Sequence, residues 1–372
     1  MKKISLMLFS IFGAFNLWAG EIKITTNLKG FSDSTQVYFV SSEGPLANTI
    51  LQNGIVEITA EIDSKPDTYY LYLLENNQPY IITLFVADEN ITIQGSKENL
   101  IYNAKISGST YHSQKEILDK SQMSTRLKGD VLQKEMQQLQ ATADWQDKNV
   151  QEKYIGVNGS LTKIDKELRD LERKYILENF DLNYAQSLLE FNLCGAESDF
   201  YTSVYNKMSK EDQKNDLGKK FLLASKSKKL SKGDAYLDIE IQNKDLETIK
   251  LSNYFKKDKK YVLVDLSSVT CPNSNQAFPI TKTFSDNNTE NLQVVSVLQS
   301  PDAETYKHFG KLNTSNWEFV YAENFLNSDD YIKYQENATP TFLLFDNQGK
   351  LVDRWVGASS HELKMNEYFG SK

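Results

Sequence analysis

The sequence feature that most limits the possible fold is an apolar segment that stops at a cysteine. Residues 262–266 read Val-Leu-Val-Asp-Leu, which is typical of a buried strand, and Cys271 and Pro272 follow shortly after. Proline suits the first position of a helix because no N–H is needed there. The sequence therefore predicts a strand that brings Cys271 to the N-terminal end of a helix. Unpaired N–H groups and the helix dipole favour a thiolate at such a position.

The size and composition of the chain indicate an ordinary multidomain globular protein. A length of 372 residues exceeds what one typical core holds, so we expect several domains. The net charge is −8, and no basic stripe interrupts the acidic sequence. This balance argues against nucleic acids and anionic membrane surfaces as partners.

Residues 1–19 have the pattern of a secretory signal peptide. Two lysines precede an apolar run over residues 4–17, which is shorter than the roughly 20 residues of a membrane span. We therefore expect export, removal of this leader after Ala19 and no membrane span in the mature chain. Export implies an oxidising compartment, yet the chain has only two cysteines, Cys194 and Cys271, so it is not a disulfide scaffold.

The spacing of apolar residues divides the rest of the chain into three parts. Residues 20–108 alternate as strands do and predict an antiparallel β sandwich or barrel. Residues 109–232 have a helical period, and residues 233–372 alternate strands with helices, as an α/β sheet does. The expected fold class is a multidomain α+β chain with a β module, a helical region and a C-terminal α/β domain.

The helical region contains a narrow apolar seam over residues 157–175, for which Ser160 is the predicted N-cap. The seam could pack against neighbouring helices, which we favour, or form a homodimer with a second copy. Cys194 ends an apolar segment, residues 188–194, that we expect to be helical. A buried cysteine acting as a small hydrophobe is the favoured interpretation there, and a disulfide with Cys271 is the alternative.

The cysteine segment resembles the thioredoxin superfamily, specifically the exported TlpA-like, AhpC/TSA-type thiol-disulfide oxidoreductases. The resemblance covers about residues 235–372. Without a gap, Asp265 falls on the family's buried acid, Cys271 on its nucleophilic cysteine and Pro279 on the proline that kinks its helix. The resemblance therefore implies a thioredoxin-like domain at the C-terminus.

Two further segments extend the resemblance. Ala338-Thr339-Pro340-Thr341 is similar to the family's cis-proline loop, which implies that Thr339 and Pro340 dock the substrate. Ile106-Ser107-Gly108-Ser109 resembles the end of an uncharacterised β module that precedes such domains in Gram-negative envelopes. This architecture implies a periplasmic location and no known activity for the module.

The departures from the family pattern limit the chemistry. Ser274 stands where the family has its second, resolving cysteine, and Ser267 and Thr270 replace two tryptophans. A dithiol cycle is completed by that second thiol, which a hydroxyl cannot replace. The resemblance thus implies monothiol chemistry at most, with Cys271 as nucleophile, Ser274 donating a hydrogen bond to it and Asp265 handling a proton. The implied partners are thiols or disulfides of envelope proteins or a small thiol.

Other classes of function have less support from the sequence. The alternative to redox chemistry is a binding or scaffold protein that keeps the fold and has lost the activity. A peroxiredoxin would need proline at position 264, where this chain has valine. His112, His308 and His361 are far apart and lack neighbouring ligands, so we expect no metal site and no cofactor.

Overall fold

The computed structural model describes residues 19–156, 158–255, 258–299, 303–322, 328–336 and 338–370. The predicted signal peptide lies outside these residues except for its last residue, Ala19. The chain divides into two compact units between Ser187 and Leu188, and each is described separately. Because this division falls inside the predicted helical region, the domain limits at residues 108 and 232 remain predictions.

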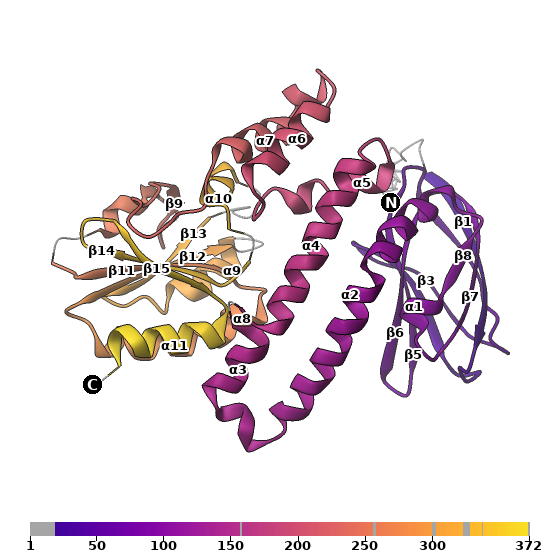
Figure 1. The fold of residues 1–372 in the computed structure, drawn as a ribbon, viewed down its shortest axis with the longest axis horizontal. Helices are drawn as coiled ribbons and strands as arrows, with labels where there is room; N and C mark the ends of the chain where they lie inside the picture. Colours follow the sequence, from indigo (N-terminus) through magenta and orange to yellow (C-terminus); the bar gives the residue numbers. More distant parts are fainter. Residues whose placement is uncertain are drawn as a thin grey trace, which may run out of the picture. The chain divides into compact units, whose positions relative to one another are not determined.

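The β module of the first unit consists of two four-stranded sheets among the described residues, ordered β4-β1-β7-β8 and β3-β2-β5-β6 (Figure 1). The pairing is antiparallel as expected, except that β1 runs parallel to β7. A parallel pair needs a long connection, which the intervening strands β2 to β6 supply. The elements are β1 (Ala19–Lys29), β2 (Gln36–Ser41), β3 (Gly44–Ile50), β4 (Glu57–Asp63), β5 (Asp67–Glu75), β6 (Gln78–Val86), β7 (Asn90–Ser96), α1 (Leu100–Asn103) and β8 (Lys105–Ser107).

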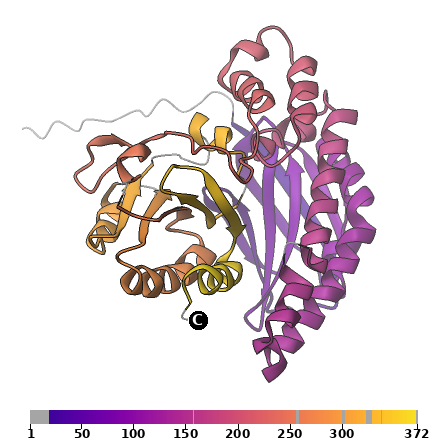
Figure 2. The same cartoon turned by 60° about the vertical axis from the view of Figure 1, so that its left-hand side comes forward.

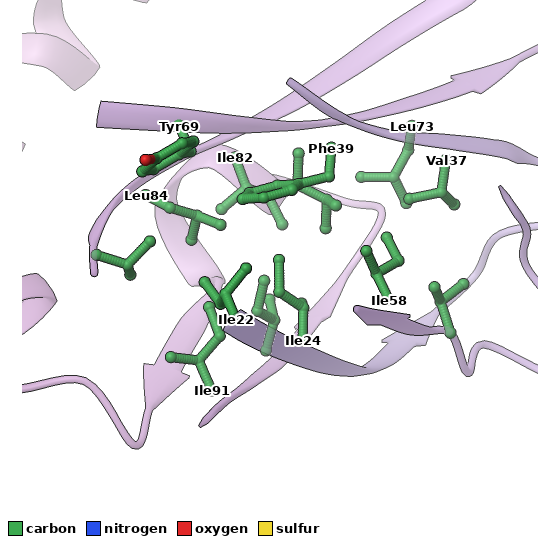
Figure 3. Close-up of a cluster of buried hydrophobic side chains, with 14 of the residues drawn as sticks. Ile22, Ile24, Val37, Phe39, Ile58, Tyr69, Leu73, Ile82, Leu84 and Ile91 are labelled. Carbon is green, nitrogen blue, oxygen red and sulfur yellow. The ribbon is translucent and has the colours of Figure 1, made fainter. Parts of the chain in front are cut away.

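The two sheets bury alternate residues of their strands against each other, as the period of two along a strand requires. Figure 3 shows the result: Ile22 and Ile24 of β1 meet the ring of Phe39 on β2. The Phe39 ring stacks on Tyr69 of β5 with centroids 5.3 Å apart. This apolar layer is the core that the alternating sequence pattern predicted.

The helices of the first unit follow the β module. They are α2 (Thr110–Gln140), α3 (Lys148–Ile155), α4 (Ser160–Glu178) and α5 (Asn183–Ser187). α2 and α4 lie side by side (Figures 1 and 2), and Gln122 of α2 donates to the backbone oxygen of Leu168 at 2.9 Å. The apolar seam of α4 thus packs against α2 of the same chain. Its first residue, Val157, lies outside the described residues. A homodimer remains a prediction.

The predicted N-cap of α4 is wrong by one residue, because Gly159 caps the helix and Ser160 is its first residue. A side chain at position 159 would place its Cβ atom 2.5 Å from the backbone oxygen of Tyr154. Only glycine fits so close an approach.

The second unit starts with a short 3-10 turn (Glu190–Asn192), α6 (Ser198–Lys207) and α7 (Asp216–Lys226). The helical segment expected up to Cys194 is therefore wrong. Gly195, with a φ of 77°, turns the chain into the left-handed region and ends any helix there. Cys194 is buried, and neither cysteine forms a disulfide, so the predicted alternative of a Cys194–Cys271 bond is also wrong.

The rest of the second unit is a seven-stranded sheet among the described residues, ordered β10-β9-β13-β12-β11-β14-β15. β11, β12 and β13 run parallel, and the outer strands pair antiparallel. α8 and α11 lie side by side along the sheet (Figure 2). The elements are β9 (Glu240–Gln242), β10 (Thr248–Lys250), β11 (Tyr261–Ser268), α8 (Pro272–Asn287), β12 (Leu292–Gln299), α9 (Ala303–Gly310), β13 (Trp317–Tyr321), α10 (Asp329–Tyr334), β14 (Thr341–Asp346), β15 (Leu351–Val356) and α11 (Ala358–Phe369).

Strand β11 lies inside this sheet, between β12 and β14, and is buried from Val262 to Ser268. Its position explains the apolar sequence, since both faces of a parallel strand are covered. Pro279 lies inside α8. No helix among the described residues has both the length and the apolar character that a membrane crossing requires.

Candidate functional site

Cys271 lies at the junction of β11 and α8. Its N–H donates to the backbone oxygen of Ser268 at 3.1 Å, and its own carbonyl accepts from the N–H of Asn275 at 3.1 Å. Cys271 is the N-cap residue of α8, and Pro272 is the first helical residue. Its side chain is partly exposed. A strand thus delivers the thiol to the positive end of a helix.

The neighbouring strand β14 brings a cis-proline to the same place. The Thr339–Pro340 peptide bond is cis, and Thr341 at the start of β14 is paired with Leu266 of β11. The Sγ atom of Cys271 lies 3.3 Å from the backbone oxygen of Thr339. Segments almost 70 residues apart in sequence therefore meet at the thiol.

Ser274 lies one turn into α8 and is fully buried. Its hydroxyl oxygen accepts the N–H of Ser268 at 3.3 Å, so its hydroxyl proton is available to another acceptor. The second cysteine of a dithiol site would occupy this position.

Asp265 is the centre of a buried polar network within the sheet. Its carboxylate accepts hydrogen bonds from the hydroxyls of Ser267, two residues along β11, and of Ser296 at 2.8 Å on β12. Ser296 in turn accepts the indole N–H of Trp317 at 3.0 Å. Among the described residues the carboxylate has no hydrogen bond to Cys271, so the structure does not bring Asp265 into direct contact with the thiol.

Comparison with known families agrees with this topology. A family model described as thioredoxin-like matches residues 258–351, which include β11, Cys271 and the cis-proline. The C-terminal domain is thioredoxin-like. A second model, for a domain of unknown function (DUF4369), matches residues 22–114 and therefore the β module. Both matches confirm the resemblance found in the sequence.

Solved structures with likeness to this chain cover between 35% and 38% of it. They include a thiol:disulfide interchange protein from Bacteroides sp. (18% identity, 38% of this chain, 92% of that chain, TM-score 0.31). The thioredoxin domain of a thiol-disulfide oxidoreductase from Bacteroides vulgatus is similar at 19% identity (38% of this chain, 99% of that chain, TM-score 0.30). An exposed lipoprotein thioredoxin from Streptococcus pneumoniae is similar at 20% identity (35% of this chain, 99% of that chain, TM-score 0.28). A comparison with curated proteins gives no match.

The surroundings of Cys271 in the thioredoxin-like domain lower the pKa of its thiol. Partial burial alone would raise this pKa, but the Thr339 side chain, the N–H groups of Asn273 and Ser274 and the Ser274 hydroxyl together outweigh it. Cys194 has the opposite environment, because burial and the nearby Glu336 raise its pKa to about 12. The two thiols of the chain therefore differ in direction: the pKa of Cys271 is lowered and that of Cys194 is raised.

The electrostatics of Asp265 differ from those of the thiol. Complete burial raises its pKa to about 6, although the hydroxyls of Ser267 and Ser296 act in the opposite direction. The carboxyl group is thus poised to gain or lose a proton near neutral pH.

Two of the three histidines, His112 and His361, are buried among structural partners. The ring of His361 stacks on Phe342 with centroids 3.8 Å apart, accepts the indole N–H of Trp355 at 3.1 Å and bonds Thr281 at 2.8 Å. His112 accepts the N–H of Phe85 at 3.3 Å where α2 meets β6. Within the described part of the chain, no three His, Cys, Asp or Glu side chains come together as metal ligands.

Sequence reasoning missed the partners that fix the site. Ser296 and Trp317 belong to the hydrogen-bond network of Asp265. Ser296 could have been identified from the parallel pairing of β11 with β12, which sets it directly opposite Asp265. No local signal marks Trp317, because its contact depends on the pairing of a third strand.

Proposed function

We propose that the thioredoxin-like domain carries out monothiol thiol–disulfide exchange at Cys271. The observation that supports this most directly is the position of the thiol: Cys271 is the N-cap residue of α8, is partly exposed, and its sulfur lies 3.3 Å from the carbonyl oxygen of Thr339 beside a cis-proline. A lowered pKa increases the fraction of reactive thiolate at neutral pH.

The exchange would proceed in two steps with no net change in oxidation state. The Cys271 thiolate attacks one sulfur of a partner disulfide, a new S–S bond forms, and the other partner sulfur leaves as a thiolate. Because Ser274 carries a hydroxyl, a second thiol from outside the chain must attack the mixed disulfide. That attack releases Cys271 as a thiolate and leaves the partner joined to the incoming thiol.

The proposed roles of the surrounding groups follow from their contacts. Ser274 donates its hydroxyl proton to the Cys271 sulfur, and Thr339 with Pro340 presents backbone along which an extended substrate segment docks. Asp265, the buried acid that the resemblance implies, would exchange a proton from within its hydroxyl network, since burial raises its pKa to about 6. The substrates would be disulfides of exported proteins or of a small thiol, in the periplasm that the resemblance to this domain architecture implies.

Trapping of mixed disulfides tests the proposal. The mature chain with Cys194→Ala, which leaves Cys271 as its one thiol, is incubated with an oxidised small thiol and with an envelope extract, then quenched with acid. Mass spectrometry should find adducts on Cys271 and none in the matched Cys194→Ala, Cys271→Ser variant. These adducts should persist until an external thiol is added, because no resolving thiol is present.

A folded protein whose Cys271 forms no adduct under these conditions would reject monothiol exchange. That result would support the alternative from the sequence, a binding or scaffold protein that retains the thioredoxin-like domain without its chemistry.

A further inference from the structure

The chain enters the cis-proline loop through a residue in an unusual backbone conformation. Helix α10 ends at Tyr334, and Gln335 follows with a φ of 54°, in the left-handed region that normally takes glycine or asparagine. Gln335 is also only 3% exposed. A glutamine stays in this conformation only where its surroundings hold it.

Tyr201 of α6 fixes the side chain of Gln335 by a hydrogen bond. Its hydroxyl donates to the side-chain oxygen of Gln335 at 2.9 Å and accepts the backbone N–H of Ala196 at 2.8 Å. The Gln335 side chain also donates to the backbone oxygen of Ile332 at 2.8 Å, so both ends of its amide are bonded. The Tyr201 ring lies beside Phe221 of α7, and α7 packs against α10.

The next residue, Glu336, is tied to two other parts of the same unit. Its side chain is 1% exposed and forms ion pairs with Arg354 of β15 and, at 3.9 Å, with Lys229 after α7. Arg354 is paired with Leu343 of β14, the strand that begins just after the cis-proline. Glu336 therefore links the start of the cis-proline loop to β15, which pairs with the strand that follows the loop, β14.

Three residues after Glu336 the chain reaches Thr339, whose backbone oxygen lies 3.3 Å from the sulfur of Cys271. We propose that Tyr201 and Glu336 are positioning residues: through them the α6–α7 segment holds the cis-proline loop against the thiol and sets its reactivity. This inference rests on the proposed function and extends it, because it assigns α6 and α7 a role in tuning the site. A protein that bound α6 and α7 could then change the reactivity of Cys271 without touching it.

The test compares three conservative variants, Tyr201→Phe, Tyr205→Phe and Glu336→Gln, in the Cys194→Ala background. Tyr201→Phe removes the hydroxyl that holds Gln335 and keeps the ring. Tyr205→Phe makes the same change one turn later on α6, at a hydroxyl that forms no hydrogen bond to a described residue. Alkylation of Cys271 is followed against pH by mass spectrometry, and hydrogen exchange is followed in peptides that cover residues 338–345.

The Thr339 side chain helps to lower the pKa of Cys271, so loosening the loop in Tyr201→Phe should shift the alkylation midpoint of Cys271 upward. An increase of about half a pKa unit would slow alkylation at pH 7 by about threefold. Exchange in the loop peptides should become faster. Tyr205→Phe should match the parent in both measurements. Glu336→Gln, which keeps the shape of the side chain and removes its charge, should act in the same direction as Tyr201→Phe.

Equal midpoints and equal loop exchange in all variants would overturn the positioning role. If Cys271 of the parent chain does not react at any pH, the proposed function fails, and hydrogen exchange alone then decides the positioning role. Faster loop exchange in Tyr201→Phe would support it, and unchanged exchange would reject it.

Discussion

Replacing Asp265 with asparagine should stabilise the thioredoxin-like domain at neutral and basic pH. Complete burial raises the pKa of Asp265 to about 6, whereas an unfolded chain ionises near its ordinary value of 3.8. As pH rises above that ordinary value, the unfolded state loses the proton first, and the native state becomes progressively less stable until the native carboxyl group also ionises. At pH 8 the difference amounts to about 3 kcal/mol.

Asparagine is the appropriate replacement because the network can accept it. Its oxygen can accept from Ser296, and its NH₂ group can donate to the oxygen of Ser267, whose hydroxyl is then directed elsewhere. This rearrangement costs about 1 kcal/mol, so Asp265→Asn should be about 2 kcal/mol more stable than the parent at pH 8. The advantage should grow by about 2 kcal/mol between pH 4.5 and pH 8, independently of the hydrogen-bond cost.

Urea unfolding of parent and variant across this pH range measures the effect, with the fluorescence of Trp317 and Trp355 reporting on the core of the thioredoxin-like domain. Asp353→Asn is the matched control. Burial raises the pKa of Asp353, but hydrogen bonds from Lys364 at 2.9 Å, from the backbone N–H of Arg354 and from the hydroxyl of Tyr368 together lower it below its ordinary value. This carboxylate therefore stabilises the fold at neutral pH. Its replacement should destabilise the domain. A pH-independent difference between Asp265→Asn and the parent would refute the reasoning.

Three further predictions concern other parts of the chain. Burial lowers the pKa of His361 to about 3, so below about pH 6.5 only the unfolded chain takes up a proton at this ring. The free energy of unfolding should therefore fall by up to about 2 kcal/mol between pH 6.5 and pH 5, and urea unfolding should show that His361→Gln lacks this loss. Gly54→Ala should destabilise the β module by about 1–3 kcal/mol in thermal unfolding, because glycine there has a φ of 77° and a Cβ would lie 2.3 Å from the backbone oxygen of Leu28; an unchanged melting temperature would contradict this. Ser274→Cys should restore a resolving thiol, so that mixed disulfides on Cys271 disappear within the time of the trapping assay; adducts as persistent as those of the parent would contradict it.

The parts of the fold that the sequence predicted are those set by local patterns. The apolar run of β11 and the proline at the start of α8 identify the strand, the helix and the position of Cys271 between them. The alternation in the first hundred residues identifies the sandwich in the same way. The cis conformation before Pro340 followed from the resemblance, since no local pattern requires it.

The elements that the sequence missed depend on tertiary context. Strand β3 is an edge strand with mostly exposed side chains, so it carries no alternating apolar signal. Helix α10 is only six residues long, which is too short for a recognisable period. The hold of Tyr201 on Gln335 joins residues 134 positions apart, and only the packing of α7 against α10 brings them together.

The most direct test of the central claim compares the two cysteines of the folded chain. Alkylation is measured against pH by mass spectrometry for Cys271 and Cys194 in the same sample, and again after unfolding in urea. We predict that Cys271 of the native chain reacts with a midpoint below that of the same thiol in the unfolded chain, while Cys194 reacts only after unfolding. A native midpoint for Cys271 at or above the unfolded value, or no reaction at all, would contradict the assignment of Cys271 as the reactive group.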